Sequence, residues 1–211
     1  MQKEGLVTVL SGFSGAGKGT IMKRLLEKYP GKYNLSISAT TRSPRPGEEE
    51  GREYFFKTTE EFEKMIAEGE FLEHARFGDN YYGTPRGYVD ELLEQGRNVI
   101  LEIEVQGALQ VRKIYPHALL LFVTPPSAAE LKRRLTGRQT ETEEVIAKRL
   151  GIAARESHLM VQYDFLIVND VLEEAVDNVD RIITSEAYRS VRNISAIERM
   201  QEELKEFSKG E

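Results

Sequence analysis

The sequence predicts an α/β protein built on a doubly wound parallel sheet. Short apolar runs alternate with segments whose apolar residues recur at helical spacing, which is the pattern of parallel strands joined by helices on both faces of a sheet. The runs lie at 6–10, within 98–105, at 119–124 and at 165–168. Each run is mainly apolar, as expected of strands that are buried on both faces.

The helices follow from apolar spacing and from end signals. After the first strand and a glycine turn, apolar residues between 21 and 29 share one helical face, and Pro30 and Gly31 end that helix. Thr58 or Thr59 is expected to cap a helix that runs to about residue 68. Further helices are expected over 85–95, after a Ser127 cap, over 140–159, from about 172, and over 190–211.

Two stretches interrupt the alternation of strands and helices. Residues 33 to about 90 are mixed in character, with an aromatic, irregular part at 71–82 that suggests short antiparallel strands. A second, arginine-rich interruption follows residue 126. We therefore expect one domain over 1–211 with inserted parts. The expected core comprises 1–35, 96–126 and 161–211, the inserted α+β lobe is 36–95, and the small helical lid is 127–160.

Composition excludes several classes of function. The 211 residues contain no cysteine, so disulfides and thiolate chemistry are excluded, and three histidines at no metal-like spacing argue against zinc. The net charge of -6 argues against broad nucleic-acid binding. The sequence shows no signal peptide and no apolar run of membrane-spanning length, so a cytoplasmic protein without membrane partners is expected.

A glycine loop at residues 12–18 (GFSGAGK) matches G-x-x-x-x-G-K between a strand and a helix. Its backbone N–H groups and the helix N-terminus can bind phosphate oxygens, and Lys18 adds a mobile positive charge. Gly19 stands where Ser or Thr is usual, so Mg²⁺ is expected to be held mainly by phosphates and waters. The alternative is a plain helix-capping turn. The expected nucleotide-binding residues here are Gly12, Ser14, Gly15, Ala16, Gly17, Lys18, Gly19 and Thr20.

A second candidate phosphate site lies in the proline-stiffened loop after residue 41. Arg42 and Arg45 stand three residues apart around Pro44, and two guanidinium groups suit a phosphate monoester. Glu48 can fix one of the two arginines. In isolation, a solvated surface loop is the commoner explanation for such arginines.

Six segments in order resemble guanylate kinase, from near residue 5 to about residue 188. They are 12–18, 38–48 (SATTRSPRPGE), 51–56 (GREYFF), 70–73 (EFLE), 80–84 (NYYGT) and 137–143 (GRQTETE). The resemblance implies a P-loop kinase fold. It also implies ATP-dependent phosphorylation of GMP, and of dGMP, as a step of purine nucleotide metabolism and salvage, with Mg²⁺ bound alongside ATP.

The resemblance also implies how GMP is held. Arg42, Arg45, Tyr54 and Tyr82 would take the phosphate, while Ser38, Glu73 and Thr84 would recognise guanine. A carboxylate at Glu73 can accept from both N1–H and the N2 amine of guanine, and adenine would leave it unpaired, which is costly when it is buried.

Two further acids follow the apolar run Val99 to Leu101. Glu102 and Glu104 are expected to share one face by strand alternation. The family often has Asp at these positions. An acidic group at a strand end beside a phosphate loop is placed to organise the waters of Mg²⁺. In the family, the position of Glu102 lies nearer the phosphates, and that of Glu104 near guanine. Ordinary charge at a strand end is the alternative.

An arginine lid would complete the site. Arg134, Arg138 and Arg149 match family positions that close on the transferring phosphates, and Asn169 matches one near the adenine of ATP. Catalysis is then expected from Lys18, Arg42 and these three arginines through positioning and charge stabilisation. No general base is needed, because the acceptor is already an anionic phosphate oxygen.

Two other functions and two assembly states stay open at this point. The chain could phosphorylate another small phosphorylated acceptor, or it could be a catalytically silent, peptide-binding relative of guanylate kinase. The apolar stripe of the tail, Ile194, Ile197, Met200 and Leu204, suggests a helix packed on the core or on a partner chain. The protein could therefore be a monomer or a homo-oligomer.

Overall fold

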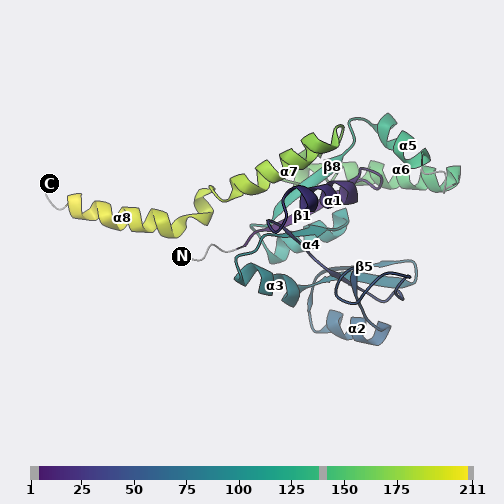
Figure 1. Ribbon diagram of the computed structural model, residues 1–211, viewed down its shortest axis with the longest axis horizontal. Coiled ribbons are helices and arrows are strands. Elements are labelled where there is room, and N and C mark those ends of the chain that lie inside the picture. Colours follow the sequence, from purple (N-terminus) through teal and green to yellow (C-terminus); the bar gives the residue numbers. More distant parts are fainter. Residues whose placement is uncertain (1–4, 138–141, 209–211) are drawn as a thin grey trace.

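The protein is described by a computed structural model over residues 5–137 and 142–208. A parallel five-stranded sheet lies at the centre in the order β2-β7-β1-β8-β9 (Figure 1). Its strands are β1 (Val7–Gly12), β2 (Asn34–Leu35), β7 (Val99–Glu102), β8 (Leu119–Thr124) and β9 (Phe165–Val168). The four apolar runs of the sequence therefore form β1, β7, β8 and β9, and the predicted α/β fold is confirmed.

Helices cover both faces of this sheet, as the apolar runs predict. Leu10 of β1 packs in the cluster formed with α1 (Lys18–Lys28) and α7 (Leu172–Glu186). The adjacent Val9 points to the opposite face, where it packs with α3 (Arg86–Glu94) and α4 (Val105–Ile114). The two helix layers lie on opposite sides of the sheet (Figure 1).

A second sheet interrupts the core between β2 and α3. Its strands are β3 (Ser38–Thr40), β4 (Tyr54–Phe56), β5 (Phe71–Phe77) and β6 (Asn80–Pro85), in the order β4-β3-β6-β5. The β5–β6 pair confirms the antiparallel strands suggested for 71–82. Strand β4 was not among the predicted elements.

The helix of this second sheet, α2 (Thr59–Ala67), begins with a reciprocal cap. The Thr58 hydroxyl accepts from the Glu61 N–H, and the Glu61 carboxylate accepts from the Thr58 N–H. Phe62 then stacks against Phe71 at 4.3 Å and Tyr81 at 5.3 Å between ring centroids. Thr58 is therefore the cap of the two candidates, and the sheet has its own small apolar core.

The predicted strand over 98–105 is wrong in its second half. β7 ends at Glu102, and Glu104 is the N-cap residue of α4. Glu102 and Glu104 therefore do not share a strand face. The β-branched Ile103 and Val105 imitate a continued strand, and Gly107 weakens the helical signal of α4.

Two helices form the arginine-rich segment after β8. Ser127 caps α5 (Ala128–Thr136) by accepting from the Glu130 N–H, as predicted. The next helix, α6 (Glu143–Ser157), is shorter than the expected 140–159. Arg138 lies outside the described residues.

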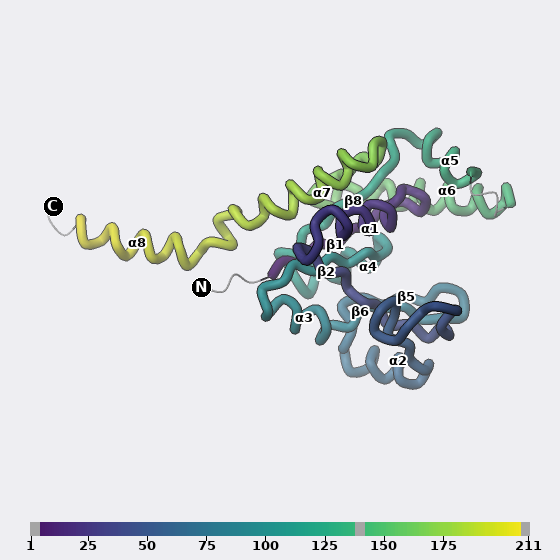
Figure 2. Tube along the Cα trace, in the orientation of Figure 1, coloured from purple at the N-terminus to yellow at the C-terminus, as the bar shows by residue number. Residues whose placement is uncertain are grey.

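The last helix, α8 (Ile194–Ser208), projects away from the rest of the chain (Figures 1 and 2). None of its described residues is buried, and its apolar side chains are exposed. The suggestion that the tail packs on the core is therefore wrong for the described part of α8. Within the described residues, no helix is long and apolar enough to cross a membrane.

Candidate active site

The loop between β1 and α1 has the backbone shape of a phosphate cradle. Gly15 and Gly17 have φ values of 90° and 93°, a region that other residues rarely adopt. At Gly12, with φ of 147°, a Cβ would lie 2.1 Å from the Val123 carbonyl oxygen. Gly17 is the N-cap of α1, so the N–H groups of the helix start face the loop. Gly12, Gly15 and Gly17 are therefore required by the backbone itself.

Two cations reach this loop from different elements. The Lys18 ammonium donates to the carbonyl oxygens of Gly12 at 2.6 Å and Phe13 at 3.4 Å. From α6, Arg149 donates to the Ser14 hydroxyl at 2.5 Å. Positive charge is thus gathered beside the N-terminus of α1, where anions are favoured.

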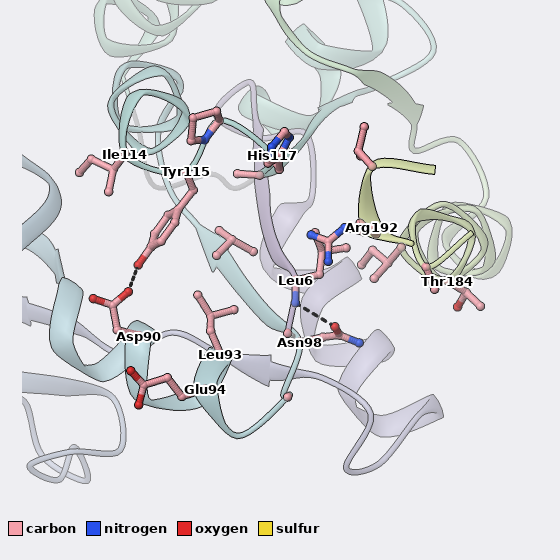
Figure 3. A pocket seen from close by; sticks show the side chains of 18 of the residues that line it. Leu6, Asp90, Leu93, Glu94, Asn98, Ile114, Tyr115, His117, Thr184 and Arg192 are labelled. Atoms are coloured by element: carbon pink, nitrogen blue, oxygen red, sulfur yellow. Dashed lines mark hydrogen bonds between the residues drawn. The ribbon is translucent and has the colours of Figure 1, made fainter. Parts of the chain in front are cut away.

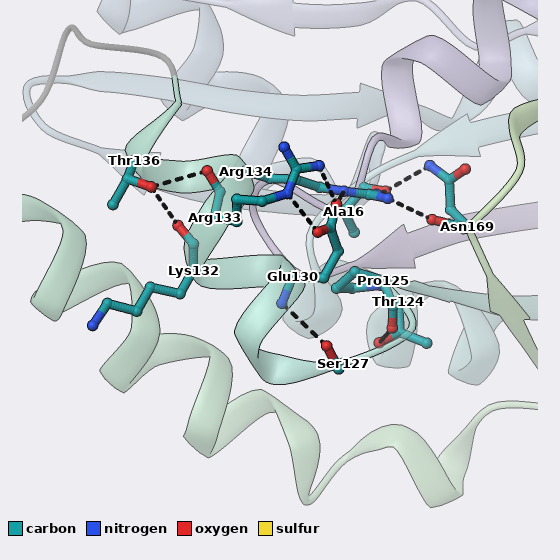
Figure 4. Close-up of polar contacts among 10 residues, drawn as sticks. All are labelled: Ala16, Thr124, Pro125, Ser127, Glu130, Lys132, Arg133, Arg134, Thr136 and Asn169. Carbon is teal, nitrogen blue, oxygen red and sulfur yellow. Dashed lines mark hydrogen bonds and ion pairs between the residues drawn. The ribbon is translucent and has the colours of Figure 1, made fainter.

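Arg134 and Asn169 meet on the other side of the loop (Figure 4). The Arg134 guanidinium donates to the Asn169 carbonyl oxygen at 2.8 Å and to the Ala16 carbonyl oxygen at 3.4 Å. The Asn169 amide also donates to Ala16, at 2.8 Å. These contacts tie α5 and the end of β9 to the loop. A cavity of about 350 Å³ opens here, lined by Gly15, Gly17, Thr20, Arg134, Asn169, Asp170 and Leu172.

Glu130 is a residue of this site that sequence reasoning missed. Its carboxylate accepts from Arg134 at 2.7 Å and from Arg133 at 2.6 Å. Hydrogen bonds from Arg133 and then Arg134 lower the pKa of Glu130 to about 2. The spacing of four residues between Glu130 and Arg134 on one helix was the available signal.

The arginine loop after β3 is organised by Glu48. One carboxylate oxygen accepts from the Arg42 guanidinium at 2.9 Å, and the other accepts from the Arg45 N–H at 2.8 Å. The Arg42 hydrogen bond, followed by that of Arg45, lowers the pKa of Glu48. Arg42 also lies over the Tyr54 ring at 5.4 Å, and Tyr54 contacts Tyr82 edge to face at 6.1 Å. Arg42, Tyr54 and Tyr82, three of the residues predicted to hold one phosphate, are therefore adjacent, and the fourth, Arg45, is joined to Arg42 through Glu48, which accepts from its backbone N–H.

Glu73 and Thr84 face each other across the β5–β6 pair. The Thr84 hydroxyl donates to Glu73 at 2.8 Å, and both residues are buried, with Glu73 only 7% exposed. Burial raises the pKa of Glu73, Thr84 hydrogen bonds oppose this, and nearby Glu104 adds a smaller increase. Ser38 is half-buried on β3 of the same sheet. A buried carboxylate with unused acceptor capacity is suited to a ligand with two adjacent N–H donors.

Glu102, the last residue of β7, lies beside the phosphate loop. Its carboxylate lies 3.5 Å from where a Cβ on Gly19 would stand. Burial raises the pKa of Glu102, while the charge of Lys18 acts in the opposite direction. Glu156 of α6 is a second acid that sequence reasoning missed, because only the fold brings it near Glu104. Burial raises the pKa of Glu156, and the charge of Glu104 raises it further. Over the ranges 5–137 and 142–208, no cluster of three His, Asp or Glu could hold a metal ion.

A larger cavity, of about 870 Å³, lies at the opposite edge of the core sheet (Figure 3). Leu6 and Asn98 line it at the amino ends of β1 and β7, and Tyr115 contributes from the end of α4. Ligands of open parallel sheets bind at the carboxyl ends of the strands. The phosphate loop is at that carboxyl edge, so this cavity is separate from the candidate active site.

The fold and this site define a P-loop kinase that acts on a small phosphorylated acceptor. The guanylate kinase family model matches residues 5–186. The chain is 50% identical to a guanylate kinase of Streptococcus thermophilus, over 92% of this chain and 93% of the relative. It is 47% identical to a guanylate kinase of Lactococcus lactis, over 97% of this chain and 100% of the relative.

A solved structure gives the same result. The crystal structure of guanylate kinase from Anaplasma phagocytophilum superimposes with a TM-score of 0.72 at 32% identity, covering 91% of each chain. The chain therefore belongs to the guanylate kinase family, and it is an enzyme of the nucleoside monophosphate kinase class. The comparisons lend no support to the silent binding module or to a kinase for a different acceptor.

Proposed function

We propose that this chain phosphorylates GMP, and also dGMP, with ATP through the residues assembled around the phosphate loop and the second sheet. Family membership supports the reaction. The observation that carries the site is the buried Glu73–Thr84 pair, at 2.8 Å, beside the arginine loop. The second sheet therefore offers both a group that can recognise a base and a site for a phosphate, which are the two parts of a nucleoside monophosphate that must be bound.

In this proposal the second sheet binds GMP. Its phosphate is held by Arg42 and Arg45, which Glu48 orients, and by the hydroxyls of Tyr54 and Tyr82. Guanidinium groups and phenolic O–H groups together can donate to several oxygens of one phosphate. The guanine is read by Ser38, Glu73 and Thr84, with Glu104 as an additional acidic neighbour.

ATP is assigned to the loop formed by Gly12, Ser14, Gly15, Ala16, Gly17, Lys18, Gly19 and Thr20, with Asn169 beside it. Mg²⁺ would supply charge neutralisation on the phosphates. The residues fit an ion carried mainly by phosphates and waters, because no cluster of three His, Asp or Glu in the described residues could hold a metal ion, and Glu102 lies beside Gly19 and Lys18. Glu102 would accept hydrogen bonds from waters of the ion.

Transfer then depends on positive charge held around the reacting groups. A phosphate oxygen of GMP forms a bond to the γ-phosphorus of ATP while the bond to the β-phosphate oxygen breaks, which leaves ADP and GDP. In the proposal, Lys18, Arg134 and Arg149 at the phosphate loop and Arg42 of the arginine loop would together stabilise the spread negative charge. Arg138 belongs to the same proposed set, although its position is outside the described residues.

In this proposal, the two substrates bind to different parts of the chain. The core over 1–35, 96–126 and 161–211 carries ATP, the lobe over 36–95 carries GMP, and the lid over 127–160 closes on the phosphates. Closure would exclude water, which could otherwise accept the phosphoryl group. We place the enzyme in purine nucleotide metabolism in the cytoplasm, in keeping with its substrates.

The decisive experiment is ADP formation from ATP and Mg²⁺ with GMP, AMP, UMP or CMP as acceptor. GMP is expected to be the preferred acceptor by a wide margin, with little ADP when no acceptor is added. Lys18→Ala should lower kcat by about 100-fold or more, whereas Lys23→Ala, an exposed lysine of the same helix, should leave it unchanged. Preference for another acceptor would overturn the guanine assignment, and normal turnover by Lys18→Ala would overturn the loop assignment.

A further inference from the structure

Gly107 of α4 lies directly against the Glu73 carboxylate. A Cβ at this position would stand 2.8 Å from Oε2 of Glu73 and 3.2 Å from its Cγ and Cδ. A separation of 2.8 Å is shorter than real Cβ contacts, so one side must move. The atoms in the way belong to the end of a side chain, so the Glu73 carboxylate would be displaced rather than the helix backbone.

The backbone of α4 gives no other reason for glycine at this position. Gly107 is the third residue of the helix and has an ordinary helical backbone. Glycine inside a helix is less favourable than alanine, because its backbone loses more conformational freedom on folding. The position therefore carries a local cost, and what it provides in return is room for the carboxylate.

Glu73 has little freedom to avoid an added methyl group. Its Oε1 accepts from the Thr84 hydroxyl at 2.8 Å on one side, while Oε2 faces Gly107 on the other. The Glu73 side chain is buried. The helix α4, which covers one face of the core sheet, also packs against β5 of the second sheet. Glu73, which lies on β5 of the second sheet, is therefore held in position by α4, a helix that packs on the core sheet.

We propose that Gly107 is a positioning residue for the guanine base, acting through the Glu73 carboxylate. The inference rests on the proposed role of Glu73 in reading guanine. A displaced carboxylate can no longer accept from N1–H and the N2 amine together. Affinity for GMP and discrimination between guanine and bases without the N2 amine should fall together.

The test is Gly107→Ala with Gly87→Ala as its matched control. Gly87 is the second residue of α3, and a Cβ there would meet nothing within 4 Å. Steady-state kinetics would be measured with GMP and with inosine monophosphate, which lacks the N2 amine. For Gly107→Ala, KM for GMP should rise about tenfold or more, kcat and KM for ATP should change little, and the preference for GMP over inosine monophosphate should fall. Gly87→Ala should behave as wild type.

A double-mutant cycle separates this inference from the assignment of Glu73. In a Glu73→Gln background, Gly107→Ala should cause no further rise in KM for GMP, because the group that it displaces is already impaired. An unchanged KM and acceptor preference in Gly107→Ala would overturn the inference. So would equal losses for GMP and ATP with a lowered Tm, which indicate a packing defect. If Glu73→Gln itself keeps full preference for GMP, the proposed role of Glu73 fails instead.

Discussion

Nη2 of Arg42 lies 2.9 Å from Oε1 of Glu48, and both side chains are largely withdrawn from solvent. The second oxygen of the same carboxylate accepts from the backbone N–H of Arg45 at 2.8 Å. One acid therefore sets the geometry of a loop that carries two cations. Without it, the arginine loop would have to be ordered by the incoming phosphate, at a cost in binding free energy.

We expect Glu48→Gln to raise KM for GMP by about tenfold, because an NH2 group, which cannot accept a hydrogen bond, replaces one of the two accepting oxygens. KM for ATP should stay close to wild type, since the phosphate loop is formed by other elements. Steady-state kinetics with each substrate varied in turn would measure both. Glu49→Gln, in the same loop but exposed, is the control, and an equal effect of both variants would contradict the orienting role.

Glu73→Gln should raise the stability of the folded protein near pH 8 and lower its affinity for GMP. Burial raises the pKa of Glu73, so the folded state favours the protonated form. The contribution of Glu73 to stability is full below its unfolded pKa, about 4.3, and is lost as pH rises through the folded pKa. Without nucleotide, the glutamine variant should be more stable than wild type near pH 8, and this difference should close as the pH falls toward 4.

Urea denaturation at several pH values would measure that difference, and GMP titration would show the accompanying loss of affinity. Glu70→Gln provides the control, because Glu70 is exposed just before β5. A stability difference that grows toward low pH has the wrong sign and would contradict the buried, protonation-favouring environment of Glu73.

Local signals predicted the core well, because each one depends on neighbouring residues. The apolar runs predicted four of the five core strands, and Ser127 and Thr58 cap their helices as their types suggest. The phosphate loop was predictable because its backbone requires glycine at fixed positions. The helix α4 was missed because Ile103 and Val105 favour a strand and Gly107 disfavours a helix.

The arrangement of the candidate site was only partly accessible from sequence. Tyr54, Tyr82 and Arg42 come from separate strands and a loop, and their contacts arise from the order β4-β3-β6-β5. Spacing singled out Arg42 as a phosphate candidate, whereas the family resemblance was needed to join Tyr54 and Tyr82 to the same phosphate. The contact of Gly107 with Glu73 joins a helix of one sheet to a strand of the other, and nothing in the linear sequence marks it.

Asn169→Ala should loosen the phosphate loop on its ATP side. The Asn169 amide donates to the Ala16 carbonyl oxygen at 2.8 Å in a buried position. Its loss would leave that oxygen to the longer Arg134 contact at 3.4 Å. We expect KM for ATP to rise about tenfold, with KM for GMP little changed. Asn178→Ala, on the exposed side of α7, is the control, and a selective rise in KM for GMP would contradict the assignment.

Removal of α8 should leave the enzyme folded and active. The family match ends at residue 186, and no described residue of α8 is buried. A chain that ends at Asn193 keeps the hydrogen bonds from the Asn193 amide to the Ala187 and Arg189 carbonyl oxygens, which close the end of α7. It also loses the exposed apolar side chains of Met200, Leu204 and Phe207.

We expect kcat and both KM values of the shortened chain within about twofold of those of the full chain, because truncations act through the burial and hydrogen bonding of the backbone that they remove. Thermal unfolding and steady-state kinetics of the two chains would measure this. A large fall in Tm or kcat would show that α8 supports the core in solution, contrary to its exposed position.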